Sequence, residues 1–303
     1  MINLEKLYWD CVAVKNFLSL SKKVKNISKK VFFDSRRMLD LDIYGNIGAA
    51  NKIIILSHTG TANSDGLCNV YLAEQLYLSG YTVVAFNSQG FRNIITDEPF
   101  TGEKKSMSIL GNILDNVVDY IREENSEAPI LAGAFSAGGL FLINHFSQND
   151  RNIAGIVNHA AFYYVEGIYD DPTYILIFPT IDLQILYAKN FILSGKFKNL
   201  MKIYKAGFDW RYLYKINNNE DFCNDVHENK TNVPIIAIHC KNDSVLSIKS
   251  ARKFFKQLNS HHASLIEISG AGHSLTENVV KLFVEQCDEL CNNWIENSNK
   301  IKE

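Results

Sequence analysis

Residues 130–139 read ILAGAFSAGG, an uncharged segment that passes from branched apolar residues to small ones. Its first half has the composition of a buried strand, and the residues that follow, as far as Phe146, have that of a buried helix. Ser136 therefore lies on a sharp strand-to-helix turn, which needs small residues two positions before and after the serine; Ala134 and Gly138 meet that need. Such a serine is either an exposed nucleophile or an ordinary helix N-cap, and this segment alone does not decide between them.

Short apolar runs alternate with amphipathic segments on both sides of this turn. Strands are expected at residues 31–33, 38–44, 53–56, 81–86, 130–134, 153–157, 234–239 and 263–268. Helices are expected at residues 66–79, 107–122, 137–146, 248–258 and 275–296. The alternation predicts an α/β fold with a mostly parallel sheet flanked by helices, and a hairpin formed by the first two strands.

The regular alternation is interrupted between residues 163 and 230. This stretch is rich in aromatic residues and has no clear strand, and the strand pattern resumes at residue 234. We interpret residues 163–230 as a helical cap, or lid, inserted into one α/β core made of residues 31–162 and 231–303. Residues 1–30 are expected to form an N-terminal helical segment, whose cluster of lysines favours a solvated face over membrane attachment.

Composition excludes several classes of protein. The 303 residues include 31 lysines and arginines against 33 aspartates and glutamates, a net charge of −2, so no overall field attracts nucleic acid. Six cysteines are too few for a disulfide scaffold, which favours a reducing, cytoplasmic location. The charge-free segment 128–149 has the length of a membrane span, but Pro129 and the glycines in it indicate a strand, a turn and a helix, so no transmembrane segment is expected.

Two further polar residues follow strands later in the chain. Asp243 lies just after the expected strand 234–239, and His273 just after the expected strand 263–268. The carboxyl ends of parallel strands meet at one edge of a sheet, so both side chains are expected beside Ser136. A serine hydroxyl becomes nucleophilic when a histidine takes its proton and a carboxylate orients that histidine. Taken singly, Asp243 could be a turn residue and His273 a surface histidine, but at three consistent strand ends the sequence predicts a catalytic triad.

Two backbone N–H groups are expected to bind the oxyanion that such a triad generates. The first belongs to Ala137, at the N-terminus of the helix after the serine. The second belongs to Thr59, in the loop after the strand 53–56, with Gly60 as the alternative. We interpret His58 as a structural residue of this loop rather than as a base. The residues expected to line the substrate pocket are His58, Gly60, Phe135, Phe162 and Tyr163.

No metal or cofactor is expected. The chain has no glycine-rich phosphate loop that ends in Lys-Ser or Lys-Thr. Cys287 and Cys291 share a helix face without a second pair of ligands, so core packing explains them better than zinc binding. Cys223 and His227 would supply only half of a metal site.

The three motifs together resemble the α/β-hydrolase superfamily over residues 53–294, and the order serine, aspartate, histidine is that of the superfamily. A narrower likeness is to the acyl-carrier-protein thioesterase of bacterial bioluminescence. It is carried by residues 101–109, 134–137, 242–243 and 270–278. Residues 81–90 instead look similar to membrane-lipid hydrolases of the same fold, although NSQG at 87–90 departs from the Asp-x-Arg-Gly form of many relatives. The two likenesses leave the substrate open.

The motifs and the superfamily resemblance imply a serine hydrolase that cleaves an ester or thioester with an apolar acyl group through an acyl-enzyme. The substrate would be a small acyl or polyketide-like molecule, free or bound to a carrier protein. The sequence leaves the oligomeric state open, with a homodimer as one option. The same triad also serves carbon–carbon hydrolases and lyases that act on β-diketones or polyketides. A non-enzymatic small-molecule receptor on the same fold is the third interpretation.

Overall fold

The computed structural model describes residues 27–32, 37–57, 67–86, 92–93, 107–161, 231–243, 246–258, 260, 262–273 and 275–302. The expected cap at residues 163–230 and the expected N-terminal segment as far as residue 26 lie outside these residues, so both stay predictions. The described residues form the expected α/β core, whose first strand begins at Ile27 rather than at residue 31.

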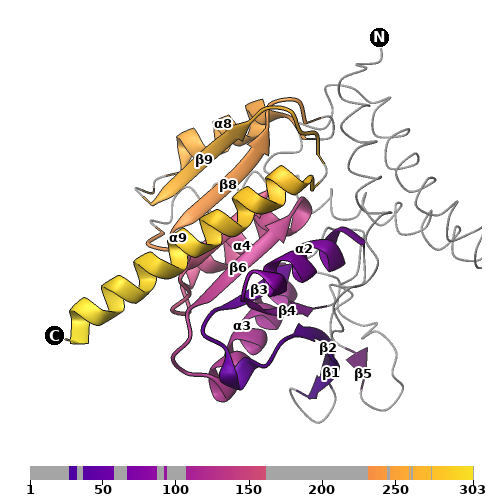
Figure 1. The fold of residues 1–303 in the computed structure, drawn as a ribbon, viewed down its shortest axis with the longest axis vertical. Helices are drawn as coiled ribbons and strands as arrows, with labels where there is room; N and C mark the ends of the chain where they lie inside the picture. The colour runs from indigo at the N-terminus through magenta and orange to yellow at the C-terminus, as the bar shows by residue number, and fades with distance from the viewer. Residues whose placement is uncertain are drawn as a thin grey trace, which may run out of the picture.

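The core is one sheet with helices on both of its sides (Figure 1). The strands are β1 (Ile27–Phe32), β2 (Arg37–Tyr44), β3 (Ile53–Ser57), β4 (Thr82–Phe86), β5 (Arg92–Asn93), β6 (Ile130–Phe135), β7 (Gly155–His159), β8 (Ile235–Cys240) and β9 (Ala263–Ile268). The helices are the short 3-10 helix η1 (Ile47–Ala49) and the α-helices α2 (Leu67–Leu78), α3 (Met107–Glu124), α4 (Ala137–Gln148), α8 (Ile248–Gln257) and α9 (Glu277–Lys302). These elements confirm the alternation of strands and helices expected from the sequence.

The strand order in the sheet is β1-β2-β4-β3-β6-β7-β8-β9, with the short β5 paired to β2. Neighbouring strands from β4 to β9 in this order are parallel, whereas β1, β2 and β5 form antiparallel pairs. The fold class predicted from the sequence, a mostly parallel sheet flanked by helices with an added hairpin, is therefore confirmed. Because β3, β6, β7, β8 and β9 run in the same direction, their carboxyl ends lie along one edge of the sheet.

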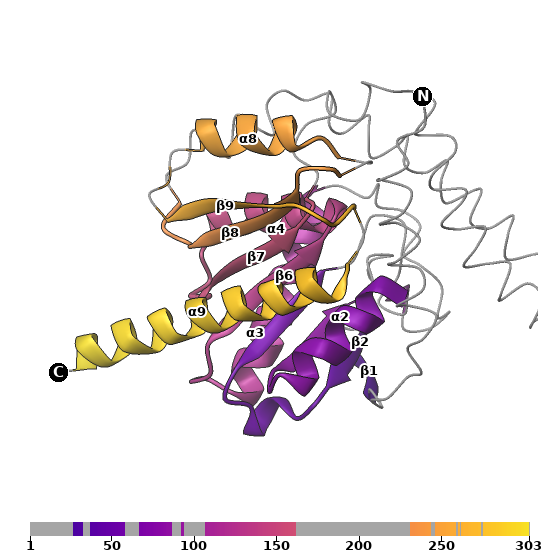
Figure 2. The ribbon, with the colours of Figure 1, turned by 45° about the horizontal axis from the view of Figure 1, so that its top comes forward.

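Each face of the sheet carries its own apolar layer. Helices α3, α4 and α8 pack on one face, and α2 and α9 pack on the other (Figure 2). Along β3, Ile53 and Ile55 belong to the first layer, and Ile54 and Leu56 to the second. A strand that is buried on both faces appears in the sequence as a continuous apolar run, which is why the pattern predicted it. No helix in the described part of the chain has both the length and the apolar composition needed to cross a membrane.

Strand β7 lies further along the chain than expected. Arg151 and Asn152 adopt positive φ angles of 47° and 52° in the turn that precedes it. This turn delays the strand, which runs over Gly155–His159 instead of 153–157. The shift places a histidine, His159, at the carboxyl end of a strand that pairs directly with β6.

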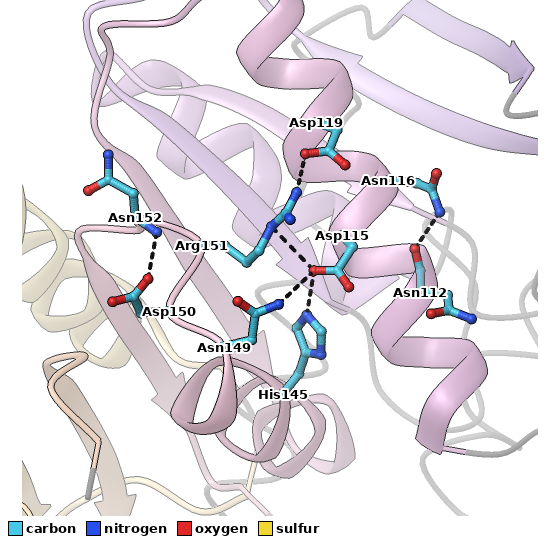
Figure 3. A network of polar contacts seen from close by, with 9 residues as sticks. All are labelled: Asn112, Asp115, Asn116, Asp119, His145, Asn149, Asp150, Arg151 and Asn152. Carbon is cyan, nitrogen blue, oxygen red and sulfur yellow. Dashed lines mark hydrogen bonds and ion pairs between the residues drawn. The ribbon is translucent and has the colours of Figure 1, made fainter.

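A polar network fixes α4 to α3 at the end of α4 that is remote from Ser136 (Figure 3). His145 Nε2 donates to Asp115 Oδ1 at 3.1 Å, and Arg151 Nε lies 3.3 Å from the same oxygen. Arg151 also pairs with Asp119. Burial lowers the pKa of His145 more than the Asp115 carboxylate raises it. The C-terminal end of α4 is therefore fixed by contacts that do not involve Ser136.

Candidate active site

Ser136 occupies the turn between β6 and α4 in a backbone conformation that residues other than glycine rarely adopt. Its φ is 58° and its ψ is −129°, and its side chain makes no capping hydrogen bond to the helix. The conformation is the strained turn expected of a nucleophile, whereas the N-cap interpretation has no hydrogen bond to support it. Two backbone bonds hold the turn: Ser136 N–H donates to His159 O at 2.9 Å, and Gly139 N–H donates to Ser136 O at 3.1 Å.

Close packing behind this turn depends on Gly139. A Cβ atom at this position would lie 2.5 Å from Ala161 Cβ and 3.1 Å from Asn158 Cβ. Both neighbours belong to β7 or to the residues just after it, so a larger residue at position 139 would push α4 away from the sheet. The small residues that follow the serine in the sequence thus have a packing reason as well as a conformational one.

Ala137 is the first residue of α4, so its N–H group lies at the N-terminus of the helix. The first N–H groups of a helix have no partner within the helix and carry a partial positive charge. This placement is the one expected of an oxyanion donor. The strand that leads to the second expected donor is also in place, because Ser57, the last residue of β3, pairs with Ala134 of β6.

Several predicted site residues lie outside the part of the chain that the structure describes. These residues are His58, Thr59, Gly60, Phe162 and Tyr163. The second oxyanion donor and most of the pocket lining therefore stay predictions.

Asp243 and His273, which the sequence predicts as partners, lie in hydrogen-bond contact. His273 Nδ1 is 2.9 Å from Asp243 Oδ2, and Leu246 N–H donates to Asp243 Oδ1 at 2.7 Å. Burial of the Asp243 side chain opposes its ionisation, but His273, His239 and the Leu246 N–H outweigh burial and lower the pKa of Asp243 to about 2. A carboxylate that is charged at neutral pH accepts a hydrogen bond from Nδ1–H of His273, and this tautomer leaves Nε2 available as a base.

Backbone bonds and apolar packing hold the two loops that carry this pair. Lys241 N–H, in the loop after β8, donates to the carbonyl of Ile268 at the end of β9, at 2.8 Å. Ala271 and Leu275, which flank His273, are both buried in the apolar layer that α9 covers. The imidazole is therefore positioned by residues on both sides of it in the chain.

Phe135 connects His273 to the strand that leads to Ser136. Its ring centroid lies 5.1 Å from that of His273, and Phe135 immediately precedes Ser136 in the chain. The same ring stacks on His159, with 5.7 Å between centroids and 8° between planes. Expected as a pocket residue, Phe135 is only 5% exposed and belongs to the apolar layer beside α9. It supports the site from within the core.

Two buried histidines beside the predicted triad were not identified from the sequence. His159 Nδ1 donates to Ile238 O at 3.2 Å, and complete burial lowers the pKa of His159 to about 3. His239 Nε2 donates to Leu246 O at 2.9 Å and lies 3.7 Å from Asp243 Oδ2. Each histidine lies at or near the carboxyl end of an apolar strand, and that position was the only signal in the sequence that could have indicated them.

Among the described residues, no cluster of three or more side chains is suited to hold a metal ion. Cys287 and Cys291 are both buried in α9, and burial raises the pKa of each thiol. Tyr81 OH donates to Asp288 at 2.7 Å and lies 3.9 Å from Cys291 Sγ. These contacts support core packing as the role of the two cysteines. Cys223 and His227 lie outside the described residues.

A comparison with profiles of known protein families gives no match. Solved structures, in contrast, share the fold over most of the chain. A soluble variant of monoglyceride lipase from Saccharomyces cerevisiae, in complex with a substrate analogue, is 17% identical with a TM-score of 0.60, over 91% of this chain and 97% of that one. The esterase Pf2001 from Pyrococcus furiosus is 15% identical with a TM-score of 0.59, over 90% of this chain and 92% of that one. Dienelactone hydrolase from Anabaena variabilis is 12% identical with a TM-score of 0.55, over 88% of this chain and 97% of that one. At these identities the shared property is the fold.

Proposed function

The chain has the α/β-hydrolase fold, and from this premise we propose that it is a serine hydrolase with a catalytic triad of Ser136, His273 and Asp243. One observation carries the proposal. The buried Asp243 is hydrogen-bonded to His273 at 2.9 Å, and the ring of His273 packs on Phe135, the residue next to the strained Ser136. Backbone strain of this kind costs about 1–3 kcal/mol and tends to persist at functional sites.

The proposed reaction proceeds in two halves. His273 Nε2 takes the proton of the Ser136 hydroxyl as the serine oxygen attacks the substrate carbonyl, and then returns this proton to the leaving group. The product of this half is an acyl-enzyme on Ser136. In the second half, His273 takes a proton from water, the hydroxide attacks the acyl group, and the proton returns to Ser136 as the acid leaves. Throughout, Asp243 holds the Nδ1 proton of His273 and stabilises the imidazolium form.

The negative charge that develops on the carbonyl oxygen needs hydrogen-bond donors. We assign one donor to the Ala137 N–H, at the N-terminus of α4, and the second to Thr59 in the loop after β3. Loss of one such donor typically lowers the rate about 100- to 1000-fold. None of these steps requires a metal ion or an organic cofactor.

The proposed substrate is a carboxylic ester with an apolar acyl group. Aromatic residues in the sequence between 163 and 230 favour an apolar wall above the site. The similarity to a lipase of monoglycerides and to an esterase favours an oxygen ester over other acyl compounds. Acyl thioesters, which the sequence resemblance to a thioesterase indicates, would react by the same steps with a thiol as the leaving group.

The proposal is tested with p-nitrophenyl esters of increasing acyl length and with a fluorophosphonate probe. The wild-type chain should hydrolyse the esters and be labelled on Ser136, and Ser136→Ala should abolish both. Ser147→Ala is the matched control, because Ser147 is a buried serine on the same helix whose hydroxyl donates to the carbonyl of Asn144. Ester hydrolysis that survives in Ser136→Ala would overturn the assignment.

A second panel separates the reaction types that share this triad. Acyl thioesters and β-diketones are compared with esters of the same acyl chain. Faster turnover of the thioester would identify a thioesterase, and cleavage of the diketone without ester hydrolysis would identify a carbon–carbon hydrolase. Tight binding of these compounds with no product would instead indicate a receptor.

A further inference from the structure

Two hydrogen bonds hold the backbone of Leu246 beside Asp243, the carboxylate of the proposed triad. Its N–H donates to Asp243 Oδ1 at 2.7 Å, and its carbonyl accepts from His239 Nε2 at 2.9 Å. The residue that orients the carboxylate is thus itself fixed by a buried imidazole. His239 is 1% exposed and lies in β8, just before the turn that carries Asp243.

The direction of the second bond fixes the protonation of one ring nitrogen. A carbonyl oxygen only accepts, so Nε2 of His239 carries a proton. This Nε2 is 3.7 Å from Asp243 Oδ2, which is beyond hydrogen-bond distance, so the hydrogen-bond link from His239 to the carboxylate passes through Leu246. His239 Nδ1 is buried and makes no hydrogen bond within the described residues. Within the described residues, Nε2 is therefore the ring nitrogen through which His239 makes its hydrogen bond.

Titratable groups on the neighbouring strands also lie close to His239. On β9, Glu267 is the register partner of His239, and its carboxylate is bound by Arg252 of α8 through two bonds of 2.6 Å. On β7, His159 is close enough for the two histidines to influence each other electrostatically. Glu267 already has a partner in Arg252, and the groups beside His239 that belong to the candidate site are Leu246 and Asp243.

We propose that His239 is a positioning residue: its Nε2–H fixes Leu246, so that the Leu246 N–H occupies Oδ1 of Asp243 and leaves Oδ2 for His273. The inference rests on the proposed function of Ser136, His273 and Asp243. Without the bond to His239, the backbone of residue 246 would lose one of the hydrogen bonds that hold it, and the Leu246 N–H would hold Asp243 less firmly. His239 touches neither substrate nor the reacting atoms.

The experiment uses two amide side chains that imitate different nitrogens of histidine. In His239→Gln the amide nitrogen is placed like Nε2 and can still donate to Leu246. In His239→Asn it is placed like Nδ1, which makes no hydrogen bond within the described part of the chain. His239→Leu removes both. The probe is p-nitrophenyl butyrate, and the readouts are kcat, KM and the acidic limb of kcat/KM against pH, which reports the pKa of the base.

We expect His239→Gln to stay within a few-fold of wild type. His239→Asn and His239→Leu should lose about 100-fold in kcat with little change in KM, the size of effect that follows a displacement of about 1 Å in a catalytic group. Their acidic limbs should move to lower pH, because an imidazolium that is less well paired with Asp243 loses its proton more readily. A purely structural role would lower the fraction of active protein without moving this limb.

His145→Leu is the control for loss of a buried histidine. His145 is hydrogen-bonded to Asp115 at the far end of α4 (Figure 3), so this variant should lose stability and keep the wild-type acidic limb. Wild-type kcat and pH profile in His239→Leu and His239→Asn would overturn the proposal, and so would a Gln variant as impaired as the Leu variant.

Failure of the proposed function is recognised separately. If the wild-type chain hydrolyses no ester, the far-downfield proton resonance of the His273 Nδ1–H bond replaces kcat as the readout, and its loss in His273→Gln assigns it. The resonance should persist in His239→Gln and shift or broaden in His239→Asn and His239→Leu. An unchanged resonance in all three variants would contradict the positioning role whether or not the chain is an enzyme.

Discussion

The ring of Phe135 packs against the imidazole of His273, with 5.1 Å between the ring centroids and 41° between the planes. Phe135 is the last residue of β6, and Ser136 follows it directly. The contact links the end of the strand that leads to the proposed nucleophile to the loop after β9. An almost fully buried aromatic ring thus lies between the proposed base and the turn that holds the serine.

The first prediction concerns this aromatic contact. Phe135→Leu should lower kcat about tenfold, because a smaller side chain lets His273 shift relative to Ser136. Phe146→Leu is the matched control, since Phe146 is a fully buried phenylalanine on α4 that contacts His145 instead. Both variants should lose about 1–2 kcal/mol in the free energy of unfolding. Equal kcat values in the two variants would show that Phe135 contributes only to the core.

Asp243→Asn should lower kcat about 10⁴-fold with the fold intact. The amide oxygen can still accept from Leu246 N–H, but the amide nitrogen would then face His273 Nδ1 and donate to it. His273 would be held in the tautomer whose Nε2 already carries a proton and cannot accept another from Ser136. Asp115→Asn makes the same change in the Asp–His pair at the far end of α4 and should leave kcat unchanged. Ester kinetics and circular dichroism of both variants check this.

The backbone strain at Ser136 predicts a difference in stability between two variants that both lack the hydroxyl. Ser136→Gly should be more stable than Ser136→Ala by about 1–2 kcal/mol, because only glycine adopts a φ of 58° with a ψ of −129° without strain. At Ser147, inside α4, the order should be reversed, with the glycine variant about 1 kcal/mol less stable than the alanine variant. Denaturant unfolding of the four proteins measures both differences. The same order at both positions would argue against strain at the turn.

The lowered pKa of His159 predicts how the free energy of unfolding depends on pH. Its pKa in the folded chain is lowered to about 3 by burial and by the positive charge of His273, against about 6.5 in an unfolded chain. Between these values the unfolded chain binds a proton that the folded chain does not. The contribution of His159 is therefore fully present above about pH 6.5 and is lost as the pH falls, by up to about 1.4 kcal/mol per pH unit.

His159→Asn separates the contribution of His159 from the rest of the pH dependence of the free energy of unfolding. The asparagine amide can still donate to Ile238 O in place of Nδ1, but it does not titrate. Unfolding free energies are measured between pH 7.5 and pH 5 for both proteins. The wild-type slope should be the steeper one. Equal slopes would mean that His159 is accessible to protons in the folded state.

The parts of the fold that the sequence predicted are those that leave a side-chain signature. Strand β3 is buried on both faces, so it appears as an unbroken apolar run, and Gly139 is small because a Cβ would collide with Ala161. The late start of β7 left no such signature, since Arg151 and Asn152 adopt left-handed conformations that their residue types do not indicate. The contacts of His159 and His239 depended on strand register and on backbone carbonyls, which the sequence pattern does not specify.

The packing of α9 implies that the three side chains of the proposed triad would not be enough for reactivity on their own. The loop that presents His273 is seated by Ala271 and Leu275 in the same apolar layer as Val279 and Phe283 of α9. A shortened polypeptide that stopped before this helix would still contain the hydroxyl, the imidazole and the carboxylate, yet would lack the surface on which the imidazole rests. We therefore expect the proposed activity to appear only after α9 has docked, so that a nascent chain would stay inert until then.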